Sequence, residues 1–82
     1  MKVLLYRDSA SECHFQFESG ELFYAHAHCD NTCAVVRVAK PYYWRSAHFE
    51  NCPSVDEAIH RFCGGKEELV LSFIPLKEKP II

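Results

Sequence analysis

Apolar and polar residues alternate along much of the first half of the chain, with the period of two that is typical of β-strands. The strand-forming segments are 2–7, 13–17, 22–29 and 33–40. Each is followed by residues that favour turns or end strands: Asp, Ser, Asn and Gly clusters after the first three, and Pro41 after the fourth. We therefore expect four strands here, and a further strand over 69–74 near the end of the sequence.

The second and third segments form a predicted β-hairpin whose register depends on the turn at Gly20. A three-residue loop with Gly20 in the left-handed conformation pairs Phe15 with Phe23 and His14 with Tyr24. A two-residue turn would instead mix apolar and polar side chains, because a slip of one residue moves every side chain to the opposite face. The expected core face holds Phe15, Phe17, Phe23, Ala25 and Ala27. The opposite face holds His14, Tyr24 and His26, with His28 as a fourth candidate.

A short helix is predicted after Ser54. Ser54 and Glu57 have the spacing of a capping box, and the glycines at 64 and 65 supply a stop. Apolar residues recur at helical spacing, at Val55, Ala58, Ile59, Phe62 and Cys63. The polar side would carry Asp56, Glu57, His60 and Arg61.

These elements predict a single α+β domain over 1–82: an antiparallel sheet of four to five strands with one short helix on one face, in the order β-β-β-β-α-β. The stretch 42–51 shows no strong period and is predicted to be a loop that could include short extended structure. Because one helix covers one face, the other face is expected to meet solvent or a partner.

Length and charge narrow the classes of function. An 82-residue chain with a net charge of -2 has room for one core and lacks the basic surplus of proteins that neutralise many phosphates. It contains no apolar run of bilayer-spanning length and no recognisable signal peptide, so a cytoplasmic location is expected. The odd number of cysteines, five, favours reduced thiols over disulfides.

A zinc site is one alternative, because His26 and His28 are two apart on a strand and point the same way. Cys33 or His14 would be the third ligand, although the spacing matches no common zinc pattern. A thiol enzyme is another, with His60 and Cys63 three apart on the helix. Cys63 also completes the apolar stripe, and the sequence contains no catalytic motif, so we expect no cofactor and no enzymatic activity.

The stretch 37–45 is the candidate contact surface, since Tyr, Trp and Arg dominate protein–protein hot spots. Its residues could also close one end of the core, or stack on the bases of a single-stranded nucleic acid. An acidic group near the hairpin would face a basic partner surface. The candidate binding residues are Arg37, Lys40, Tyr42, Tyr43, Trp44 and Arg45, with Asp8, Glu12, Glu18 and Glu21.

The segment 70–75, which reads Val-Leu-Ser-Phe-Ile-Pro, resembles the tail of small phage-encoded anti-CRISPR proteins. That resemblance implies a compact, strand-rich inhibitor with one helix before its last strand, and it transfers no functional residue. Together with the absent catalytic motifs, it leads us to expect a non-catalytic binding protein that inhibits a host nucleic-acid-handling or defence complex. The oligomeric state stays open.

Overall fold

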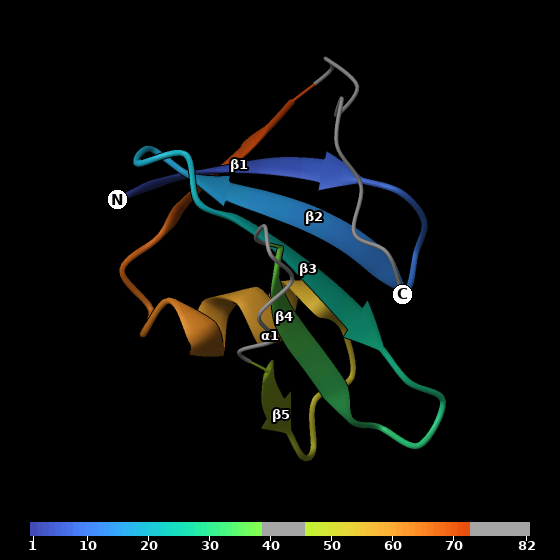
Figure 1. The fold of residues 1–82 in the computed structure, drawn as a ribbon. Coiled ribbons are helices and arrows are strands. Elements are labelled where there is room, and N and C mark those ends of the chain that lie inside the picture. The colour runs from blue at the N-terminus through green and yellow to red at the C-terminus, as the bar shows by residue number, and fades with distance from the viewer. Residues whose placement is uncertain (39–45, 73–82) are drawn as a thin grey trace.

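The computed structural model describes residues 1–38 and 46–72, and these residues form a six-stranded sheet with one helix packed on one face (Figure 1). The strands follow the order β5-β4-β3-β2-β1-β6 across the sheet. The elements are β1 (Lys2–Arg7), β2 (Glu12–Phe17), β3 (Leu22–Ala27), β4 (Cys33–Val38), β5 (Ser46–Phe49), α1 (Val55–Phe62) and β6 (Glu68–Leu71).

The predicted α+β class with a single helix before the last strand is confirmed for the described residues, but the expected sheet is wrong in two respects. The observed sheet has a sixth strand, β5, inside the stretch predicted as a loop with short extended structure, and β5 pairs with β4 and is too short, at four residues, to show a period. The sheet is also mixed, because β6 runs parallel to β1 while all other neighbours are antiparallel. The chain leaves β5 at one edge, passes through α1 and returns as β6 at the other edge.

The hairpin register is confirmed. Phe15 lies opposite Phe23 and His14 opposite Tyr24. Gly20 has φ +94°, in the left-handed region that favours glycine. The Phe17 N–H donates to the Glu21 carbonyl at 3.0 Å, and these two residues close the three-residue loop.

The strand boundaries differ from the prediction mainly at turns. β3 ends at Ala27 instead of residue 29, because the His28 N–H already donates to the Thr32 carbonyl across the next turn. β4 ends at Val38, and residues 39–45 lie outside the described part of the chain. The last strand begins at Glu68 and ends at Leu71, and the predicted residues 73–74 also lie outside the described part.

The core lies between α1 and the sheet. Phe15 is fully buried, and its ring stacks on Phe23 at 5.1 Å and meets the edge of Phe62 at 5.8 Å. Val55, Ala58 and Ile59 of the helix are also buried, as their spacing predicts. The helix packs against β3 and β4, in the half of the sheet that ends at β5.

The predicted cap at the C-terminal end of α1 is confirmed, and the predicted capping box at its N-terminal end is half formed. The Glu57 N–H donates to Ser54 Oγ at 3.3 Å, which is one half of the capping box. The Glu57 carboxylate accepts a hydrogen bond from Arg61 Nε at 3.0 Å instead of closing the other half. At the C-terminal end the Gly65 N–H donates to the His60 carbonyl and the Gly64 N–H to the Arg61 carbonyl, the two bonds of a Schellman motif.

Candidate interaction surface

The predicted aromatic contact surface falls mainly outside the described residues. Lys40, Tyr42, Tyr43, Trp44 and Arg45 all lie in 39–45, and Arg37 is the described member of the group. Arg37 forms an ion pair with Glu21 of the hairpin at 3.3 Å. The guanidinium of Arg37 is therefore already engaged within the domain, and the aromatic surface stays a prediction.

The four acidic candidates lie at two opposite ends of β2. Asp8 and Glu12 flank the β1–β2 turn, whereas Glu18 and Glu21 flank the β2–β3 turn. Each also has a partner within the domain: Asp8 contacts His14, Glu12 accepts from Tyr24, Glu18 accepts from the Lys2 N–H and Glu21 pairs with Arg37. The structure does not gather them into one acidic patch.

The sheet face opposite α1 carries the predicted polar side chains, but its centre is not bare. His14 is 3% exposed and Tyr24 is 7% exposed, with their rings 5.0 Å apart. His14 Nδ1 lies 2.5 Å from Asp8 Oδ2, and the Tyr24 hydroxyl donates to Glu12 Oε2 at 2.5 Å. Burial and the Glu12 carboxylate raise the pKa of Tyr24. The expectation of an open face is thus wrong at these two residues.

A carboxylate-backed imidazole such as His14 is a common arrangement for a general base. Its second ring nitrogen, Nε2, is buried and has no hydrogen-bond partner among the residues that the structure describes. Because that nitrogen is not accessible, a substrate could not meet it without rearrangement of this face.

The structure brings together two of the four zinc candidates. The rings of His26 and His28 lie 4.6 Å apart. Cys33 pairs with Ala27 and is fully buried on the helix side of the sheet, whereas His26 points to the other side. Cys33 is therefore wrong as a third ligand, because adjacent positions on a strand face opposite ways. No group of three or more His, Cys, Asp or Glu suited to a metal occurs among residues 1–38 and 46–72.

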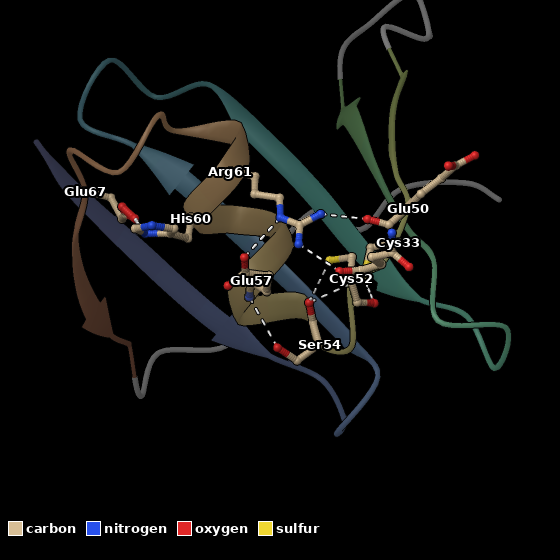
Figure 2. A network of polar contacts seen from close by, with 9 residues as sticks. Cys33, Glu50, Cys52, Ser54, Glu57, His60, Arg61 and Glu67 are labelled. Atoms are coloured by element: carbon tan, nitrogen blue, oxygen red, sulfur yellow. Dashed lines mark hydrogen bonds and ion pairs between the residues drawn. The ribbon is translucent and has the colours of Figure 1, made fainter.

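The Cys33 thiol belongs instead to a buried cluster at the start of the helix (Figure 2). Cys33 Sγ donates to the Cys52 carbonyl at 3.2 Å and to the Ser54 carbonyl at 3.3 Å. Cys52 Sγ donates to the same Ser54 carbonyl at 3.4 Å. Burial, together with Cys52, raises the pKa of Cys33 to about 12. These thiols act as small core residues with weak hydrogen bonds.

The geometry does not favour the proposed thiol nucleophile at Cys63. Burial and the nearby Glu67 carboxylate raise the pKa of Cys63 to about 11, whereas a nucleophilic cysteine needs a lowered one. His60 Nδ1 lies 2.7 Å from Glu67 Oε1, so the imidazole is engaged by the carboxylate (Figure 2). The side chain of Glu67 is 5% exposed, whereas that of His60 is 59% exposed.

Arg61 joins the helix to the segment that follows β5, a role that its place on the polar side of the helix did not predict (Figure 2). Its two terminal nitrogens donate to the carbonyls of Glu50 and Asn51, each at 2.7 Å. Asn51 has φ +51°, so the guanidinium holds a turn that non-glycine residues rarely adopt. This end of the sheet is thereby attached to α1.

The opposite end of the sheet exposes apolar side chains. Leu69, Val70 and Leu71 of β6 are 40%, 37% and 49% exposed, and Leu4 and Met1 beside them are also exposed. We call these five residues the β6 edge surface. They were not among the predicted site residues, although three consecutive large apolar residues in a short final strand are a usable signal. A soluble monomer usually blunts such an edge with charges, proline or a covering segment.

The backbone of β6 also presents hydrogen-bonding groups outward. The N–H groups of Glu68 and Ser72 donate inward to the Met1 and Leu5 carbonyls, at 2.6 and 2.8 Å. Because the N–H and C=O of one strand residue point to the same side and successive residues alternate, Leu69 and Leu71 direct theirs away from β1. Within the described residues β6 pairs with no strand but β1.

Comparison of the chain with known protein families, with curated proteins and with solved structures finds no match. The described part of the chain contains no helix with the length and apolar character needed to span a bilayer.

Proposed function

We propose that this domain is a binding module that contacts a partner protein through the β6 edge surface. The observation that carries the proposal is the combination of three exposed apolar side chains with outward backbone groups on the same four-residue strand. Addition of a partner strand would pair the outward backbone groups of β6 and would remove its apolar side chains from water. Main-chain bonds would supply affinity and the leucine side chains would supply specificity.

The candidate catalytic groups support a non-catalytic role. Burial raises the pKa of three thiols, to about 11 at Cys13 and Cys63 and to about 12 at Cys33. These sulfurs therefore stay protonated at neutral pH. The unpaired nitrogen of His14 is enclosed. None of these groups combines an activated form with access to a substrate, which enzymatic chemistry requires.

The proposal also includes the class of the partner. The resemblance to anti-CRISPR proteins covers residues 70–75, of which Val70, Leu71 and Ser72 are described, and it favours a host defence or nucleic-acid-handling complex. The net charge of -2 favours a protein surface of such a complex over direct contact with phosphates.

Capture from a bacterial lysate tests the proposal if edge variants are compared side by side. Immobilised wild-type protein should retain a specific protein that Leu71→Lys fails to retain, because a lysine on the edge opposes strand addition. His48→Lys is the matched control, since His48 is an exposed residue in β5, the strand at the other edge. Equal capture by Leu71→Lys and wild type would show that the binding surface lies elsewhere.

A second candidate function, weak zinc capture, is favoured by the contact between the rings of His26 and His28. Titration of untagged protein with zinc chloride in a calorimeter should then give heat that His26→Ala abolishes. His48→Ala serves as the control because His48 is exposed on another strand. Identical titration curves for wild type and His26→Ala would rule this site out.

A further inference from the structure

The β6 edge has a geometry that a second copy of the same edge can complete. Its outward backbone groups belong to Leu69 and Leu71, two residues apart, with Val70 between them. In an antiparallel pair, two such residues on facing strands exchange both N–H···O=C bonds. Two β6 strands related by a twofold axis therefore match when Leu69 of each copy lies opposite Leu71 of the other. The axis then passes between the two Val70 residues.

We propose that a second copy of this chain occupies the β6 edge when no other protein is bound there, and that the two copies form a symmetric dimer with one sheet continuous across both. This inference rests on the proposed function and adds a second occupant that competes for the same edge. Four backbone hydrogen bonds form across the axis, two for each Leu69–Leu71 pair. The interface is isologous, so it closes at two copies and leaves no further β6 edge open.

The side chains fit this register on both faces of the joined sheet. Leu69 and Leu71 are level with Val3 and Leu5 of β1, so they lie on the helix side. Pairing places four leucines from the two copies next to one another there. On the other side Val70 meets Val70 of the second copy, beside Leu4, which is level with Val70 in β1.

The charges select the antiparallel arrangement. Glu68 faces the position of Ser72 of the second copy in this register, so no like charges lie opposite each other. A parallel arrangement in register would place the two Glu68 carboxylates side by side, and like charges directly opposite destabilise a strand pair. A parallel pair also lacks the twofold symmetry that closes the assembly.

The first test is the mass of the untagged wild-type protein by sedimentation velocity, from about 1 µM to about 500 µM. We expect a shift from monomer to dimer with a dissociation constant of roughly 10–100 µM, because short-strand interfaces lie at the small end of the range. Leu69→Pro removes one outward donor but none of the inward bonds, so it should weaken the dimer at least tenfold. Leu71→Lys should do the same without a change in backbone preference, and circular dichroism checks the fold of both.

Cross-linking tests the register. In a Cys29→Ser background, which removes the exposed native thiol, Val70→Cys should form an interchain disulfide under oxidised glutathione. The two Cα atoms at position 70 would be about 4.5 Å apart, within the range that disulfides bridge. Leu69→Cys is the control, because its two Cα atoms would lie roughly 8 Å apart, given the strand spacing and rise per residue. Its cross-linking should be at least tenfold slower.

The outcomes separate this inference from the proposed function. A wild-type protein that stays monomeric up to about 500 µM overturns the dimer. The lysate comparison with Leu71→Lys then still tests the edge as a site for another protein. A dimer that persists in both Leu69→Pro and Leu71→Lys, or equal cross-linking at positions 69 and 70, also overturns the inference.

Discussion

The two edge strands of the sheet, β5 and β6, contain four residues each, yet they differ in how far the rest of the domain covers them. At the β5 edge, Phe49 packs against the core and Arg61 binds the two carbonyls that follow the strand. At the β6 edge, all four residues from Glu68 to Leu71 are exposed. One edge is thus tied to the helix by packing and charge-assisted hydrogen bonds, and the other depends on β1 for its backbone pairing.

The position of α1 explains the difference. An eight-residue helix is about 12 Å long and about 10 Å wide, and it packs here against β3 and β4. With strands about 4.8 Å apart, β6 lies roughly 14 Å from β3 across the sheet, beyond the width of the helix. A single short helix cannot cover six strands. The uncovered edge is therefore the place where the domain can still gain stability from a partner.

The largest loss of stability is expected from a substitution of Phe15, which lies in the part of the sheet that the helix covers. Its ring is fully buried between Phe23 and Phe62, so Phe15→Ala should lower the free energy of unfolding by about 3–5 kcal/mol. Urea unfolding followed by circular dichroism measures this loss. Phe15→Leu, which keeps most of the volume, should cost clearly less. Equal losses for the two variants would mean that the ring is not packed as described.

The sequence predicts the part of the sheet that the helix covers better than the part that the helix leaves uncovered. The Phe15–Phe23 register and both helix caps were predictable, because turn chemistry and periodicity act over a few residues. Parallel pairing of β6 with β1 was not, since no local pattern specifies which distant strand a short apolar segment joins. The expected zinc ligand Cys33 was wrong for a related reason. The prediction used the spacing along the chain and did not account for the alternation of side chains along the strands. Cys33 pairs with Ala27, so its thiol points into the core, on the side away from His26.

The buried thiols predict the next largest effect, a loss of stability at alkaline pH. Burial raises the pKa of Cys13 to about 11 and that of Cys33 to about 12, from 9.0 for a free thiol. Above pH 9 the unfolded chain releases these protons while the folded one keeps them, so the stability falls as the pH rises. Between pH 8 and pH 10 the two thiols should together cost about 2–3 kcal/mol.

Substitution of one thiol isolates this contribution from other groups that titrate in the same range. Cys33→Ala should show a fall between pH 8 and pH 10 that is smaller than the wild-type fall by about 1 kcal/mol. Cys29→Ser, at an exposed position, should follow the wild-type curve. A Cys33→Ala profile parallel to wild type would contradict the proposed origin of the pH dependence.

Removal of the link at the β5 edge should have an intermediate effect. Arg61→Ala loses two hydrogen bonds to backbone carbonyls and one to Glu57, which should cost about 1–2 kcal/mol in urea unfolding. Arg61→Lys should recover only part of this loss, because a single ammonium cannot match the fork that reaches both carbonyls. Arg7→Ala, which removes an exposed ion pair with Asp56, should cost less than either. A larger loss for Arg7→Ala would place the important polar link elsewhere.

The smallest effect is expected at the β6 edge. Leu71 is 49% exposed, so Leu71→Ala should change the free energy of unfolding by no more than about 0.5 kcal/mol when measured near 1 µM protein. Val3→Ala, in the strand that β6 joins, is the matched control and should cost roughly 1–3 kcal/mol because Val3 is fully buried. At several hundred micromolar, where the second copy binds, Leu71→Ala should become clearly more destabilising, since the wild-type side chain then loses its exposure to water. A cost that is small at both concentrations would mean that the leucine side chain gains nothing from self-association, and a large cost at both would mean that the monomer already covers it.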